Sequence, residues 1–234
     1  MASPRQRDDM GSQRRSSVPE RMTLLARVWF TATALVVIVG IVIQVPVATG
    51  ASEGFFDTPA ERGLNVFAFF TIQSNVAVGV STLLLALGVV SRATWFQALR
   101  LIGVVGITLT FVVFHAVLRD LQDLTGQAAV ADFLLHTVSP ILCVSGWLLF
   151  GPRGLTSRSA VLIALAYLVV WGVFTLIRGE IVGFYPYPFM NPSEQDQGYG
   201  RVAVNLVLVA AVFVALAAGA HWLDRRLLRR GRPT

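Results

Sequence analysis

The chain has 234 residues, of which 55% are hydrophobic and only 14% are charged, and its mean hydropathy is +0.67. This balance excludes an ordinary soluble domain, in which about a quarter of the residues are charged. The segments between its six apolar stretches are too short to build a hydrophobic core outside a membrane.

The first predicted element is a polar tail, residues 1–23, whose Ser, Arg, Gln and Asp content predicts disorder. A helix needs about 20 apolar residues to cross a bilayer. In lipid its backbone must satisfy its own hydrogen bonds. The sequence therefore predicts an all-α polytopic membrane protein, with a six-helix transmembrane domain at 24–223 and a basic tail at 224–234. The expected spans are about 24–48, 64–90, 97–118, 130–150, 158–178 and 201–223.

The basic residues, all arginine, predict the orientation of these spans. Fifteen of the 19 fall in the two tails and in the second and fourth connections, and four fall near the other three connections. Because positive residues favour the cytoplasmic side, we expect both termini in the cytoplasm and three outer connections. Arginine without lysine is typical of a GC-rich bacterial genome, so a bacterial plasma membrane is the expected location. The net charge of +6 then indicates membrane lipids as partners rather than nucleic acid.

The second span carries polar residues on one face. Thr71, Ser74 and Asn75 are separated by three and four residues, which places them together on a helix. If the span begins outside near Leu64, Thr71 lies about 10 Å below that surface. These side chains could instead be interhelical hydrogen-bond partners, and for Ser74 this is the favoured interpretation. The third span ends with His115 near the outer surface.

His136 is the residue that most strongly indicates a functional site. It lies roughly 9 Å into the fourth span, where an ionisable group is costly and usually faces a cavity. Asp132 precedes it by one turn on the same face, although this aspartate could also be a solvated residue at a helix start. Pro140 is expected to free the carbonyl of His136 and to bend the helix.

The outer ends of the last two spans add further polar groups. Arg178 ends the fifth span, and Asn205 lies one turn into the sixth. The connection between them contains Tyr185-Pro186-Tyr187-Pro188-Phe189, whose prolines exclude a regular helix. The intramembrane polar residues thus concentrate in the outer half of the bilayer, which predicts one pocket that opens outward. The predicted supporting or substrate-binding residues are Ser74, Asn75, His115, Asp132, Arg178 and Asn205.

These residue types can support ester hydrolysis. A histidine can take the proton of a hydroxyl group, which would make Thr71 a nucleophile, and Asp132 could orient the imidazole. Asn75, His115 or Arg178 could donate hydrogen bonds to a developing oxyanion. Two histidines and one nearby aspartate lack a recognisable ligand spacing, so neither a metal nor a cofactor is predicted.

Two other interpretations fit the same residues. The polar pocket could bind or transport a small or amphipathic solute without chemical turnover. The chain could also be a scaffold for other proteins, which would explain its charge pattern but not the clustering of polar residues in the outer half.

The segments around the two candidate catalytic residues resemble a known family. Residues 69–75, Phe-Phe-Thr-Ile-Gln-Ser-Asn, and Leu135-His136-Thr137 are similar to the paired motifs of the androgen-induced/androgen-dependent family of multi-pass membrane hydrolases. The resemblance implies Thr71 and His136 as a catalytic pair, and fatty-acid esters of hydroxy fatty acids as substrates. The pair Tyr185-Pro186 is similar to a Tyr-Pro motif of that family, which adds Tyr185 to the candidate residues.

The chain more closely resembles a bacterial group of six-span membrane proteins of unassigned function, sometimes placed beside the eukaryotic family. The run at 185–189, the following Asn191 and Gly198-Tyr199-Gly200 are the elements that carry this resemblance. It covers about residues 27–222. The extension from Asn191 to Gly200 is a departure, since it lengthens the outer connection.

Overall fold

The computed structural model describes residues 22–52, 54–121, 123–196 and 198–230. All regular secondary structure among these residues is helical, which confirms the all-α prediction. Most of the predicted N-terminal tail, and the last four residues of the C-terminal one, lie outside the described residues.

Five helical segments are long and apolar enough to cross a membrane, and a bent pair of shorter helices makes six if it counts as one span. The five are α2 (Leu24–Thr49); α5 (Thr94–Val113) with η1 (Phe114–Leu118) and η2 (Arg119–Leu121); α6 (Gly126–Phe133) with η3 (Leu134–Val138) and α7 (Ser139–Phe150); α8 (Arg158–Val182); and α9 (Tyr199–Arg230). The bent pair is α3 (Pro59–Val66) and α4 (Phe70–Ala86).

The second span is not the continuous helix at 64–90 that hydropathy predicts. It is broken at residues 67–69, and α3 and α4 meet at 62°. α3 has its own start, because Thr58 and Glu61 form a capping box and Pro59 occupies the first turn. Phe69 is extended and begins α4 without a side-chain cap. Hydropathy cannot reveal such a break, because the residues at the bend are themselves apolar.

Local signals explain the ends of the other long helices. Thr23 caps α2 by accepting a hydrogen bond from the backbone N–H of Ala26 at 3.2 Å. Ser157 caps α8 in the same way through the N–H of Ala160. α8 ends at Gly183, which adopts a left-handed conformation with φ 79° that residues with a Cβ rarely take.

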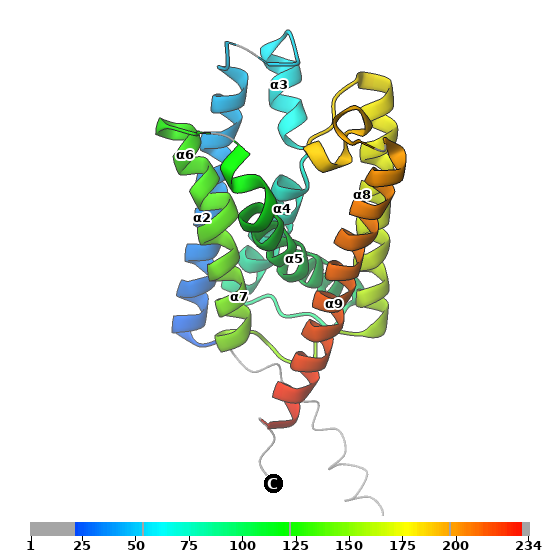
Figure 1. Cartoon of the computed structure of the whole chain (residues 1–234). Coiled ribbons are helices and arrows are strands. Elements are labelled where there is room, and N and C mark those ends of the chain that lie inside the picture. The colour runs from blue at the N-terminus through cyan, green and yellow to red at the C-terminus, as the bar shows by residue number, and fades with distance from the viewer. Residues whose placement is uncertain (1–21, 53, 122, 197, 231–234) are drawn as a thin grey trace, which may run out of the picture.

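Helix α5 lies at the centre of the bundle (Figure 1). Its apolar window is 44% buried, against 17–33% for the other four spans. Close approach to α4 depends on Gly103, because a Cβ there would lie 3.2 Å from the backbone nitrogen of Val78. The backbones of α4 and α5 therefore pack directly against each other, as small residues permit between membrane helices.

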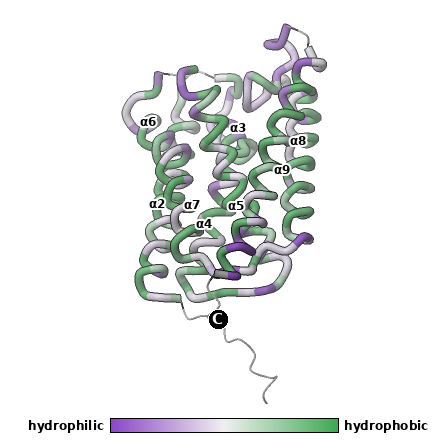
Figure 2. Tube along the Cα trace, turned by 60° about the horizontal axis from the view of Figure 1, so that its bottom comes forward, coloured by the Kyte–Doolittle hydropathy of each residue, from purple (hydrophilic) through white to green (hydrophobic). Residues whose placement is uncertain are grey.

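The outer surface of the bundle is apolar along the helices, and hydrophilic residues gather mainly toward its two ends (Figure 2). Large aliphatic side chains such as Leu24 and Ile181 are 78% and 79% exposed, as expected for residues that face lipid. α2 begins and α9 ends at the same end of the bundle, whereas α3 and the segment after α8 lie at the opposite end (Figure 1). The helices are therefore long and apolar enough for a membrane protein.

Candidate functional site

Three side chains from two spans form a chain of close polar contacts near the break in the second span. Thr71 Oγ1 lies 3.2 Å from His136 Nε2, and Asp132 Oδ1 lies 2.9 Å from His136 Nδ1. The backbone carbonyl of Asp132 is also 3.2 Å from Nδ1. Both neighbours of Nδ1 can only accept hydrogen bonds, so Nδ1 carries the proton of the neutral ring. Nε2 is then an acceptor for the Thr71 hydroxyl.

The imidazole of His136 is also held from its face. The Phe114 ring stacks on it with centroids 4.1 Å apart and planes 12° from parallel. Phe114 begins the π-helical turn η1 of the third span, and His136 lies in the π-helical turn η3 of the fourth. Such turns widen a helix by one residue and are frequent at functional sites. The two widened turns, η1 and η3, are thus in contact through the stacked rings of Phe114 and His136.

Asn75 connects α4 to the turn that carries His136. Its amide nitrogen donates to the carbonyl of Thr71 at 2.9 Å and to that of Leu135 at 3.1 Å, and its oxygen accepts from the Ser139 hydroxyl at 2.6 Å. Asn75 and Ser139 are fully buried. The network is structural support for the contact between Thr71 and His136.

The Leu135 carbonyl needs this partner because of Pro140. In this π-helical turn each backbone N–H pairs with the carbonyl five residues before it, as the N–H of Ser139 does with the carbonyl of Leu134. By the same pattern, the partner of the Leu135 carbonyl would be a backbone N–H at position 140. Proline has no N–H, and Asn75 replaces the missing donor. The expectation that Pro140 frees the carbonyl of His136 assumed a regular α-helix, and the π-helical turn moves the effect by one residue.

Tyr187 reaches the same place from the connection between α8 and α9. Its hydroxyl oxygen lies 3.3 Å from the backbone nitrogen of Thr71, which donates to it, and 3.4 Å from Thr71 Oγ1. The Thr71 N–H is available because Thr71 belongs to the first turn of α4, so the residue four positions before it lies outside the helix and offers no helical carbonyl. Burial raises the pKa of the Tyr187 hydroxyl, although its hydrogen bonds with Thr71 act in the opposite direction.

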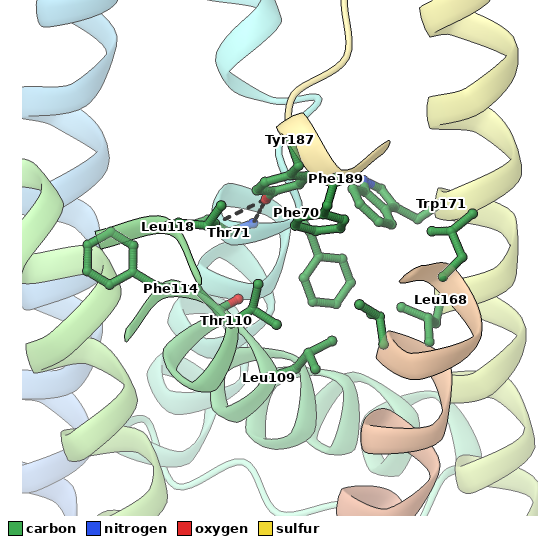
Figure 3. A pocket seen from close by; sticks show the side chains of 13 residues that line it. Phe70, Thr71, Leu109, Thr110, Phe114, Leu118, Leu168, Trp171, Tyr187 and Phe189 are labelled. Carbon is green, nitrogen blue, oxygen red and sulfur yellow. Dashed lines mark hydrogen bonds between the residues drawn. The ribbon is translucent and has the colours of Figure 1, made fainter. Parts of the chain in front are cut away.

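Thr71 also lines an apolar pocket between α4, α5, α8 and α9 (Figure 3). The pocket has about 440 Å³ free of protein atoms, including space at its mouth. Tyr187, the residue immediately before the short 3-10 helix η4 (Pro188–Met190), enters the pocket opposite Leu109 and Thr110 of α5 (Figure 3). The hydroxyls of Thr71, Thr110 and Tyr187 are almost its only polar groups, since the indole N–H of Trp171 is bonded to a backbone carbonyl.

The remaining predicted residues fall into two groups. Ser74 and His115 lie beside the site: Ser74 bonds to Thr110 at 3.0 Å, and His115 Nε2 lies 3.3 Å from Thr137 Oγ1.

Arg178, Tyr185 and Asn205 have their contacts elsewhere. Arg178 donates to the Asn65 side chain at 2.8 Å, and the Tyr185 hydroxyl bonds to Glu180. Asn205 donates to the Phe189 carbonyl at 2.9 Å, which ties η4 to α9. These three residues shape the end of the bundle where α3 lies and have no hydrogen bond to Thr71, His136 or Asp132.

Sequence reasoning missed Tyr187 and Phe114. The sequence marks Tyr187 as part of a proline-rich connection and of the run that carries the family resemblance, but gives it no role at Thr71, because its hydrogen bond to Thr71 spans 116 residues. The flanking prolines were the available signal, because they indicate a segment with a defined course rather than a flexible linker. For Phe114 the sequence offered no signal, since an aromatic residue in a membrane span is ordinary.

Comparisons with protein-family models, with curated proteins and with solved structures return no match to this chain. The site therefore has to be interpreted from its own geometry. Among the described residues, no group of three or more His, Cys, Asp or Glu side chains is placed to hold a metal ion.

Proposed function

We propose that this chain is an integral membrane hydrolase that cleaves a fatty-acyl ester. Thr71 is the nucleophile, His136 the general base and Asp132 the group that orients the imidazole. The observation that carries the proposal is the continuous chain Thr71 Oγ1–His136 Nε2 at 3.2 Å and His136 Nδ1–Asp132 Oδ1 at 2.9 Å. A hydroxyl, an imidazole and a carboxylate in this order are the arrangement that activates a nucleophile on unrelated folds.

The reaction would proceed in two steps. Thr71 Oγ attacks the ester carbonyl carbon while its proton moves to His136 Nε2. The tetrahedral intermediate then expels the alcohol, which takes that proton, and an acyl group remains on Thr71. Water, deprotonated by His136, attacks the acyl-enzyme and releases the fatty acid, which restores the Thr71 hydroxyl.

The pocket supports an acyl substrate. Its walls come mainly from aliphatic and aromatic side chains, and Thr71 lies at its edge. Such a lining binds a hydrocarbon chain by removing apolar surface from water or headgroups. Because no charged side chain lines the pocket, its lining favours an apolar ligand over a polar solute.

We also propose that the chain crosses the plasma membrane six times with both termini in the cytoplasm. The arginine distribution supports this orientation. The common end at which α2 begins and α9 ends supports an even number of crossings (Figure 1). In this orientation η4 belongs to the outer half of the molecule (Figure 1).

A fluorophosphonate probe tests the nucleophile, because it reacts covalently with activated serine or threonine hydroxyls. The purified wild-type protein should be labelled, Thr71→Ala and His136→Gln should not, and Thr71→Ser should keep the label. Thr82→Ala is the matched control, since Thr82 is a buried threonine of the same helix that bonds only to backbone carbonyls. Labelling of Thr71→Ala at the wild-type rate would disprove the assignment.

Binding or transport of an amphipathic solute without turnover is the second candidate. The apolar pocket favours it as much as hydrolysis, because the pocket alone requires no chemistry. It would replace the hydrolase if a fatty acid raised the thermal midpoint equally in wild type, Thr71→Ala and His136→Gln, and if none of them released product from p-nitrophenyl esters.

A further inference from the structure

We infer that Tyr187 is a catalytic residue whose hydroxyl donates to the oxyanion formed when Thr71 attacks the substrate. This inference rests on the proposed hydrolase function. It assigns to the connection between α8 and α9 a part in the chemistry, beyond covering the pocket.

The distances around Thr71 support a donor at this position. The Tyr187 oxygen is 3.4 Å from Thr71 Oγ1, and the oxyanion would be bonded to the carbon that Oγ1 attacks. The former carbonyl oxygen of the substrate is bonded to the same carbon as Thr71 Oγ1, so a small shift of the bound substrate brings it within hydrogen-bond distance of the Tyr187 hydroxyl. Hydrogen bonds to an oxyanion act most strongly where the donor is fixed before the reaction and water is excluded, and Tyr187 is only 7% exposed.

The backbone of α4 prepares the Tyr187 hydroxyl for this role. The Thr71 N–H donates to the Tyr187 oxygen at 3.3 Å, so the oxygen accepts from the positive end of a 17-residue helix. Accepting this bond polarises the hydroxyl and makes its own hydrogen a stronger donor. Burial raises the pKa of Tyr187, so the hydroxyl keeps its proton at neutral pH.

The other polar groups near Thr71 are already engaged. Asn75 has two amide hydrogens, and both are used, by the carbonyls of Thr71 and Leu135. The imidazole of His115 is paired with Thr137, and Arg178 donates to Asn65.

The Tyr187 ring is held in place from several sides. Its neighbours are Phe69 and Trp171, whose rings meet it edge-on at 5.8 and 6.0 Å, and Phe189, which stacks on it at 5.3 Å. A tyrosine fixed in this way meets the requirement that an oxyanion donor does not have to reorganise during the reaction.

The test compares Tyr187→Phe with wild type on p-nitrophenyl octanoate and on an alkyl trifluoromethyl ketone, which forms a tetrahedral adduct with an activated hydroxyl. Tyr187→Phe keeps the ring and its packing. We expect kcat to fall by about 10²–10³-fold with KM nearly unchanged, and affinity for the ketone to fall by a similar factor. Affinity for octanoate, a product without the tetrahedral centre, should not change. Tyr199→Phe is the control, because its hydroxyl contacts Glu180 and Tyr185 and not Thr71.

The outcomes separate this inference from the proposed function. If wild type and Tyr187→Phe hydrolyse the ester equally, Tyr187 is not the donor, although the hydrolase stands. If Tyr187→Phe is faster, its hydroxyl obstructs the site, and the inference is overturned. If wild type neither hydrolyses the ester nor reacts with fluorophosphonate, the hydrolase fails and the role of Tyr187 fails with it. Because ketone and octanoate affinities are measured on one preparation, partial misfolding of a variant does not imitate the expected result.

Discussion

At the scale of single residues, the candidate site depends on which nitrogen of His136 carries the proton. The Asp132 carboxylate and the Asp132 carbonyl oxygen both surround Nδ1, and this leaves Nε2 free to accept from Thr71. The sequence predicted that Asp132 and His136 share a helical face, because a spacing of four residues is a local property. The contact between His136 and Thr71 is not a local property, since 65 residues separate the two in the sequence.

Asp132→Asn tests this arrangement. An asparagine amide can donate a hydrogen bond to Nδ1 and so stabilise the tautomer in which Nε2 carries the proton. In that tautomer Nε2 cannot accept a hydrogen bond from the Thr71 hydroxyl. We expect kcat/KM for a p-nitrophenyl ester to fall by about 10²–10⁴-fold with the fold intact. Asp120→Asn is the control, because Asp120 is exposed in η2, which follows η1. Equal kinetics for the two variants would contradict the role of Asp132.

At the scale of secondary-structure elements, the decisive features are interruptions of helices. The break at residues 67–69 makes Thr71 a first-turn residue with an available N–H, and the two π-helical turns face each other around His136. Hydropathy predicted the helices but none of these interruptions, because they change backbone hydrogen bonding and not the apolar character of the segment. Only Pro140 signalled an irregularity, and its effect falls on Leu135 rather than on His136.

Gly179→Ala tests whether the end of α8 positions the connection that carries Tyr187. A Cβ at residue 179 would lie 2.2 Å from the Tyr185 ring, so that ring would have to move, and Tyr187 follows two residues later. We expect a stability loss of about 1–3 kcal/mol, seen as a lower thermal midpoint in detergent, together with slower ester turnover.

The same helix provides the matched control for that variant. A Cβ at Gly172 would meet nothing within 4 Å, so Gly172→Ala should leave turnover unchanged and should be neutral or stabilising, by up to about 1 kcal/mol. If the two alanine variants behave alike, the packing of Tyr185 on Gly179 does not position the connection.

At the scale of the whole molecule, the orientation in the membrane decides from which side a substrate reaches Thr71. Cysteine labelling measures it, because the only native cysteine, Cys143, is buried. A membrane-impermeant maleimide added to intact cells should label Ser193→Cys in the connection after α8. It should label Ala93→Cys, between α4 and α5, only after the cells are permeabilised. Both positions are exposed, and the reverse pattern would show that the termini lie outside.

The sequence by itself determined the class of this protein: all-helical, apolar and of membrane-spanning length. These properties follow from residue hydropathy and helix geometry, which act within a single segment. It also determined that Asp132 and His136 lie one turn apart on the same helical face. The tertiary structure alone decided that Thr71 begins a helix, that it meets His136, and that Tyr187 contacts both its N–H and its hydroxyl. These features depend on how α3, α4, α6 and the connection after α8 pack, and packing between distant segments leaves no periodic signal in the sequence.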